Sequence, residues 1–215
     1  MNEHETEPVR GLPELLPAGE SILWQGAPRW GALARRVFHV RKIAFSYAFL
    51  LAWLVYADIS DGRAAEAIVR SSLWAGGAAV AGIALLSGIA LLIERTTVYT
   101  ITTRRVVMRF GMAFPMAFNF PFRRIRSAGL RRYADGSGDI PLVLGAGDHL
   151  AYAVLWPHAR PWRFSNPEPM LRGLSDARQV AEILARALAE DMQTRTPVAA
   201  GDASASGPSA KAAAA

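Results

Sequence analysis

Two long apolar runs dominate the pattern of hydrophobic and polar positions along the chain. The second, residues 71–93, holds 23 residues without a charged side chain, and the first, residues 43–59, has 15 uncharged residues before Asp58. About 20 apolar residues of helix cross the hydrocarbon core of a bilayer. Arg41 and Lys42 can extend toward the headgroups and so compensate for the shorter first run. The two runs therefore predict a transmembrane hairpin, with a helix of a soluble core as the alternative for the first run.

Beyond residue 94 the pattern changes to short β-branched and aromatic segments that are separated by turn residues. This spacing predicts antiparallel strands, packed as a sandwich or barrel, at residues 97–101, 105–110, 113–122, 140–144 and 149–156. A further strand is expected at residues 20–24, before the first run. Near the end of the chain five apolar residues recur at helical spacing and predict a helix that starts near Asp176 and closes one end of the sheet: Val180, Ile183, Leu184, Ala187 and Leu188. The expected fold class is an α+β membrane protein.

These segments divide the chain into consecutive parts. We expect a flexible N-terminal segment at 1–19, a first strand with an interfacial helix at 20–42, the transmembrane hairpin at 43–93 with spans of about 43–59 and 71–93, a sheet domain at 94–193, and a disordered tail at 196–215.

The charges are distributed unevenly along a chain whose net charge is +6. Residues 94–132 carry nine arginines and one acidic residue, whereas the loop between the two runs is mixed in charge. The positive-inside rule therefore predicts a multi-pass protein with both termini in the cytoplasm. Six arginines are candidates for binding anionic lipid headgroups or acidic segments of a partner, with solvated strand faces as the alternative: Arg104, Arg105, Arg109, Arg123, Arg124 and Arg126.

The second apolar run is crowded with small residues. Ala78 and Gly82, and then Ala84 and Gly88, have the spacing that lets another helix approach closely. The first run of the same chain and a separate membrane protein are the two candidates for that helix, and both can apply because a helix has more than one face.

Residues that could perform chemistry are scarce. The chain has no cysteine, none of its four histidines lies in an apolar run, and it has no Walker, G-x-S-x-G or H-E-x-x-H motif. We therefore expect no enzyme activity, no cofactor and no metal site, and no nucleic-acid partner, because no binding motif accompanies the basic charge. His39 lies about one turn before the first run, where it is either a pigment ligand or a solvated ring.

Several segments carry a resemblance to known proteins. Residues 98–111, VYTITTRRVVMRFG, resemble the Y-x-(I/L)-T-x-x-R-(V/L) hairpin of bacterial pleckstrin-homology-like (PH-like) domains. Residues 156–164, WPHARPWRF, followed by PMLR at 169–172, look like those of the PH-domain-bearing photosynthetic-complex assembly proteins of purple phototrophic bacteria. The early segments 12–20 and 23–26 match as well, so that the resemblance covers roughly residues 11–193.

The resemblance implies a non-catalytic protein of the bacterial inner (intracytoplasmic) membrane. Such a protein helps to assemble the photosynthetic reaction centre with its light-harvesting 1 ring, and its PH-like domain faces the cytoplasm. The implied partners are light-harvesting 1 and reaction-centre subunits, other assembly factors and membrane lipids, and a homodimer stays open. The alternatives are a general bacterial PH-like membrane protein that binds anionic lipid or envelope partners, and a transport accessory.

Overall fold

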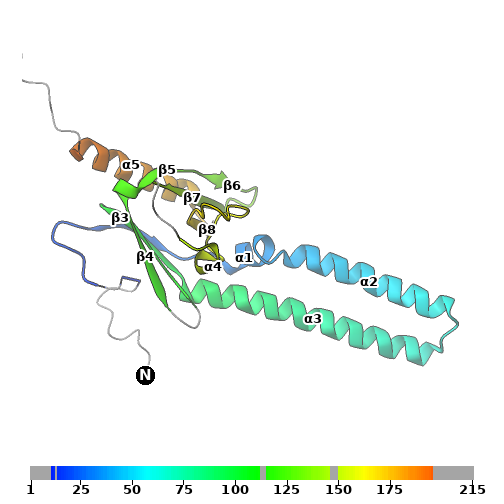
Figure 1. Ribbon diagram of the computed structural model, residues 1–215. Helices are drawn as coiled ribbons and strands as arrows, with labels where there is room; N and C mark the ends of the chain where they lie inside the picture. The colour runs from blue at the N-terminus through cyan, green and yellow to red at the C-terminus, as the bar shows by residue number, and fades with distance from the viewer. Residues whose placement is uncertain (1–10, 13, 112–114, 146–149, 196–215) are drawn as a thin grey trace, which may run out of the picture.

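The computed structural model describes residues 11–12, 14–111, 115–145 and 150–195, and it combines two antiparallel sheets with a long helical hairpin (Figure 1). The predicted tail at 196–215 lies outside the described residues. The first sheet has the strand order β1-β2-β3-β4, with β1 (Ile22–Gly26), β2 (Val98–Thr102), β3 (Arg105–Phe110) and β4 (Met116–Pro121). Strands β2 and β3 form a tight hairpin in which Ile101 lies opposite Val106.

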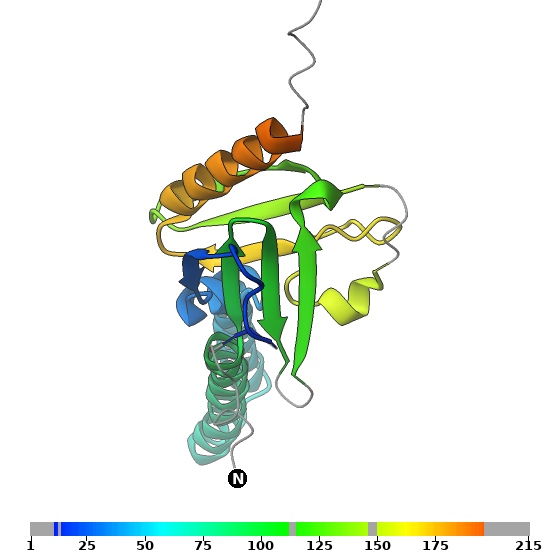
Figure 2. The same cartoon turned by 90° about the vertical axis from the view of Figure 1, so that its left-hand side faces the viewer.

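The second sheet packs across the first, and the chain passes between them through the short helix η2 (Phe122–Arg124) (Figure 2). Its strands are β5 (Ile125–Ala128), β7 (Gly138–Leu144), β6 (Arg131–Arg132) and β8 (Met170–Leu174), and β7 pairs with each of the other three. The expectation of antiparallel sheets is confirmed.

The predicted strand at 149–156 is wrong in its described part, which contains the short helix α4 (Tyr152–Leu155). The backbone satisfies its hydrogen bonds locally there, since the Leu155 and Trp156 N–H groups donate to the carbonyls of Ala151 and Tyr152. The apolar pattern that suggested a strand instead buries Leu155 in the core.

The core of the domain lies between the two sheets. Alternate residues of β2 and β3 point into it, among them Tyr99, Ile101, Val106 and Met108, and β7 contributes Ile140 and Leu142. The helix α5 (Ala177–Arg195) buries Val180, Leu184 and Ala187 in the same core, as its helical spacing predicted. Each buried Val, Leu, Ile or Met side chain among them contributes about 1.5–3 kcal/mol by leaving water.

The helical hairpin consists of α2 (Val40–Ser60) and α3 (Ala65–Thr96), which contain the two predicted apolar runs. Both helices are long and apolar enough to cross a membrane, and only 6% of the most apolar stretch of α2 and 11% of that of α3 are buried inside the protein. Figure 1 shows the pair extending away from the sheets.

A short helix, α1 (Trp30–Arg36), joins the hairpin to the sheets. Leu33 and Ala34 of α1 pack on Ala90 and Ile93 of α3, and the Arg29 N–H donates to the carbonyl of Gly173 in β8. At the other end of α1, Arg35 and Arg36 form ion pairs with Asp135 in the loop between β6 and β7. The hairpin is therefore attached to the second sheet through α1 as well as to the first sheet through β2.

Candidate functional site

The six candidate arginines do not all lie together. Strand β2 begins two residues after α3 ends, and five residues of strand at about 3.4 Å each carry the β2–β3 turn roughly 15 Å away from the hairpin. Arg104 lies in this turn, and its carbonyl accepts a hydrogen bond from the Phe122 N–H, which brings η2 alongside. We name Arg104, Arg123, Arg124 and Arg126 the distal arginine cluster; all four are exposed.

The other two arginines have different surroundings. Arg109 lies near the opposite end of β3, where it pairs with Val98 at the start of β2. Arg105 is held by Glu20, because its Nε and Nη2 donate to the two carboxylate oxygens at 2.7 and 2.9 Å. The Thr102 hydroxyl donates to the same carboxylate, whose side chain is 2% exposed. Arg105 thus ties the N-terminal segment to the β2–β3 turn.

Sequence reasoning missed Glu20 as the partner of Arg105. Glu20 lies 85 residues before Arg105, and no local pattern connects the two positions. The only available signal was that Glu20, at the start of a predicted strand, has no basic residue near it in the sequence that could pair with its carboxylate.

The glycines of α3 are not packed tightly against α2. A Cβ atom added at Gly82 or Gly88 would meet nothing within 4 Å among the described residues outside its own stretch of helix, and the same holds at Gly76 and Gly77. Glycine within a helix destabilises it by about 1 kcal/mol relative to alanine. Contact with α2 therefore does not account for the glycines of α3.

An apolar groove of about 700 Å³ runs between α2 and α3. Tyr47, Trp53 and Leu54 line it from α2, and Ala75, Gly76, Ala78 and Ala79 line it from α3. Of the two predicted packing pairs, only Ala78 faces this groove, whereas Gly82, Ala84 and Gly88 lie outside it.

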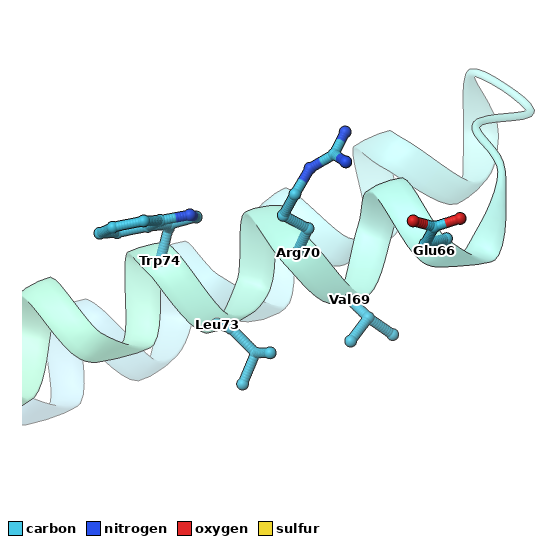
Figure 3. A pocket seen from close by; sticks show the side chains of 5 residues that line it. All are labelled: Glu66, Val69, Arg70, Leu73 and Trp74. Atoms are coloured by element: carbon cyan, nitrogen blue, oxygen red, sulfur yellow. The ribbon is translucent and has the colours of Figure 1, made fainter.

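The turn of the hairpin is fixed by one buried carboxylate. Asp58, near the end of α2, is 5% exposed. Its carboxylate accepts one hydrogen bond from Arg63 Nη1 at 3.0 Å and another from the Ser71 hydroxyl at 2.8 Å. Beyond the turn, Glu66, Arg70 and Trp74 project from α3 together with Val69 and Leu73 (Figure 3). This mixture of charged, aromatic and aliphatic side chains is typical of a membrane–water boundary.

A buried polar network lies at the root of the loop that follows α4. His158 is fully buried, its Nδ1 lies 2.6 Å from the Tyr99 hydroxyl, and its Nε2 lies 3.3 Å from the Thr97 hydroxyl. Arg172 donates from Nη1 to the Pro157 carbonyl at 2.8 Å. Burial, with a smaller effect of Arg172, lowers the pKa of His158 to about 3, and burial raises the pKa of Tyr99. His158 is therefore a neutral structural group at physiological pH.

A second polar group surrounds Asp135 and Asp139 near α1. Hydrogen bonds from Ser137 and Arg36 hold the pKa of Asp135 below its usual range, while burial and the Asp139 carboxylate raise the pKa of Tyr133 to about 12. The Arg36 guanidinium lies 3.4 Å from the centre of the Tyr133 ring. These contacts hold α1 on the second sheet.

Of the remaining histidines, the structure describes His39. The ring of His39 lies in the bend between α1 and α2, with Nδ1 3.1 Å from the Val37 carbonyl oxygen. His4 and His149 lie outside the described residues. Within the part of the chain that the structure describes, no group of three or more His, Asp or Glu side chains is placed to hold a metal ion.

Two crossed antiparallel sheets with an amphipathic C-terminal helix define a PH-like class of protein, and this chain adds a hairpin of two helices that are long and apolar enough to span a membrane. Residues 46–188 match the bacterial PH domain family. The chain is also 38% identical over 192 residues to a Rhodobacter capsulatus protein named as an uncharacterized 23.7 kDa protein in the puhA 5' region, a match that covers 87% of this chain and 89% of the relative. No solved structure matches the chain.

This chain belongs to the bacterial PH domain family. The matched range begins inside α2 and ends inside α5, so that it includes most of the helical hairpin as well as the sheets. Strand β1 and helix α1 lie before the matched range.

Proposed function

We propose that this protein is a non-catalytic membrane assembly factor for the photosynthetic reaction centre and its light-harvesting 1 ring. In this proposal α2 and α3 cross the bacterial inner membrane, both termini lie in the cytoplasm, and client subunits bind through α3 and the sheet domain. The resemblance of residues 11–193 to such assembly proteins supports the proposal, and so does the relative whose name places its gene beside puhA.

One observation carries the proposal. Gly82 and Gly88 each close a pair of small residues four positions apart, with Ala78 and Ala84, and a Cβ atom added at either glycine would meet no other part of the described chain within 4 Å outside its own stretch of helix. In a bilayer, small residues of this spacing allow the backbone of a second helix to approach closely. A client transmembrane helix would use that space.

The distal arginine cluster contributes a second contact in this proposal. It lies about 15 Å beyond the end of α3, on the side of the domain away from the hairpin, which favours an acidic cytoplasmic segment of a protein over the lipid headgroups of the same membrane. The general lipid-binding function is the second candidate, because Arg35, Arg41 and Lys42 lie beside the start of α2 where anionic headgroups would be.

The test is a mild-detergent pull-down of the tagged protein from phototrophically grown cells, with absorption spectra of the eluate. Gly82→Leu and Gly88→Leu should each remove co-purified light-harvesting or reaction-centre polypeptides without changing the amount of folded protein. Val69→Leu is the matched control, because Val69 lies on α3 outside the groove between α2 and α3 and is 58% exposed.

Two outcomes would contradict the proposal. An eluate that contains only lipid and the protein itself, together with normal pigment–protein levels in a deletion strain, would favour the lipid-binding function. If both leucine variants still bound client subunits, the proposal that clients dock on α3 would be wrong. Pigment in the eluate that disappears in His39→Ala would give His39 a ligand role.

A further inference from the structure

Residues 156–169, which we name the aromatic loop, leave the core as a stiff two-stranded stem. Ala159 pairs with Pro169, the Arg160 N–H donates to the Glu168 carbonyl at 2.8 Å, and the Met170 N–H donates to the His158 carbonyl at 2.7 Å. An ion pair of 2.7 Å between Arg160 and the Glu168 carboxylate closes the stem from the side. The stem therefore holds the tip of the loop in a defined position.

The root of the aromatic loop is fixed in the core by the network around His158. The contacts of His158 with Tyr99 and Thr97 and the hydrogen bond from Arg172 to the Pro157 carbonyl all lie at the base of the stem. Fully satisfied buried polar groups of this kind specify one arrangement of the chain. The network around His158 therefore fixes the direction in which the aromatic loop leaves the domain.

The tip of the loop presents large aromatic rings to solvent. Trp162 is 85% exposed, more than any other large hydrophobic side chain in the described ranges, and Phe164 is 61% exposed. The ring centres of Trp162 and Phe164 are 6.3 Å apart, and those of Phe164 and Tyr152 are 4.7 Å apart. The three rings therefore form one continuous surface. Trp162 also has a φ of 65°, a left-handed conformation that costs about 1–2 kcal/mol outside glycine.

The aromatic loop begins next to the N-terminal end of α2. Trp156, which is 46% exposed, packs edge-on against Phe38 with ring centres 6.0 Å apart, and Phe38 lies two residues before α2. Arg160 precedes Trp162 by two residues, Arg163 lies between Trp162 and Phe164, and both arginines interact with Glu168. Figure 1 shows α4, which leads into the loop, on the side of the sheets that faces the hairpin. The aromatic loop thus leaves the domain from an element on the side where the proposed bilayer surface would be.

We propose that the tip of the aromatic loop inserts its rings into the headgroup layer of the bilayer that α2 and α3 cross. This inference rests on the membrane topology in the proposed function. Tryptophan and other aromatic rings favour the boundary between hydrocarbon and water, and arginine side chains pair with lipid phosphates. The loop then holds the sheet domain against the membrane at a second point, which fixes the direction in which the distal arginine cluster faces.

The experiment uses the absence of cysteine from the chain, which makes single-site labelling direct. The full-length variants Trp162→Cys and Phe164→Cys, each carrying a bimane label, are reconstituted in vesicles of phosphatidylethanolamine and phosphatidylglycerol. The matched control is Gln179→Cys, an exposed position on α5, and Ala78→Cys on α3 reports on the span itself. Headgroup-attached nitroxide lipids should quench the labels at 162 and 164 several-fold more than the label at 179.

The position-78 label separates failure of this inference from failure of the membrane topology. If acyl-chain nitroxides quench position 78 while 162 and 164 behave like 179, the hairpin spans the bilayer but the aromatic loop does not reach it, and the inference is wrong. If position 78 is also unquenched, the topology fails and the inference fails with it. A pull-down without clients leaves the quenching result unchanged, so the assembly function is judged separately.

Discussion

The sheet domain buries its apolar side chains inside the protein, whereas the helical hairpin leaves most of its apolar side chains exposed. In the sheet domain, Ile101, Met108, Ile140 and Leu142 are completely buried by neighbouring strands and by α5. In the hairpin, Phe45 is 79% exposed and Leu85 is 66% exposed although both lie on long apolar helices. The sheet domain has a core of its own, whereas the hairpin needs lipid or another helix to cover its surface.

The two regions also place their polar groups differently. The sheet domain contains fully buried polar networks, of which the cluster of Thr97, Tyr99 and His158 is the deepest. In the hairpin the buried charged group is Asp58, close to the turn. A protein that keeps polar networks away from its exposed apolar helices is suited to a boundary between water and lipid.

The largest expected effect on the free energy of unfolding distinguishes a leucine in the closed core of the sheet domain from an exposed leucine of the hairpin. Leu142→Ala in β7 should lower the free energy of unfolding of the sheet domain by about 2–5 kcal/mol, because it leaves a cavity in a closed core. Leu85→Ala in α3 removes the same atoms from an exposed position and should change this free energy by less than about 0.5 kcal/mol. Denaturant unfolding in mild detergent, followed by near-ultraviolet circular dichroism, measures both. Equal losses for the two variants would contradict the distinction between the regions.

The next effect concerns the buried ion pair of the sheet domain. Glu20→Ala leaves Arg105 without its carboxylate and removes one of the two acceptors of the Thr102 hydroxyl, so we expect a loss of about 3 kcal/mol in the free energy of unfolding. Arg123→Ala, at an exposed position of the distal arginine cluster, is the matched control and should be nearly neutral. The same unfolding assay applies. A neutral Glu20→Ala would return Arg105 to the candidate docking residues.

Local patterns predicted the elements of this fold far better than the contacts between them. The uncharged runs around Phe45 and Leu85 became α2 and α3, and the repeat of Val180 and Leu184 became the buried face of α5. Those features depend on residues a few positions apart. The pairing of Glu20 with Arg105 depends on a separation of 85 residues, and it is set by tertiary packing alone.

The candidate site shows the same limit. The sequence predicted that the small residues of α3 permit close packing, but it could not tell whether α2 fills the space beside Gly82. Likewise, counting arginines could not show that the β2–β3 turn points away from the hairpin, because that depends on the direction in which β2 leaves α3. Nor could the sequence show the partners of His158, because Thr97 and Tyr99 lie 61 and 59 residues before it.

A third prediction tests the polar network of the sheet domain by pH. Unfolded His158 takes up a proton near pH 6.5, whereas the folded group has a pKa of about 3, so between these values the unfolded state binds more protons. The free energy of unfolding should therefore fall as the pH is lowered from 6.5 toward 3, by about 1.4 kcal/mol per pH unit and thus by about 2 kcal/mol at pH 5.

The control for this pH dependence is His158→Phe. That variant should lose stability at pH 7 through the missing hydrogen bond to Tyr99, but its free energy of unfolding should no longer depend on histidine protonation between pH 6.5 and 4.5. Asp135 does not interfere in this range, since its pKa is lowered and its contribution disappears only below about 3.8. An unchanged slope in His158→Phe would assign the pH dependence to another group.

The smallest effect is expected at the turn of the hairpin. Asp58→Asn replaces a buried carboxylate that pairs with Arg63 and accepts a hydrogen bond from Ser71, so the turn should open more often, by about 1 kcal/mol. Amide hydrogen exchange in detergent should accelerate roughly fivefold around residues 58–71, while β2 and β7 should exchange as in the unmodified protein. Asp61→Asn, at an exposed neighbouring position, is the matched control. Faster exchange that spread into the sheets would mean that the two regions unfold together, and the distinction between a domain with its own core and a hairpin with exposed apolar helices would fail.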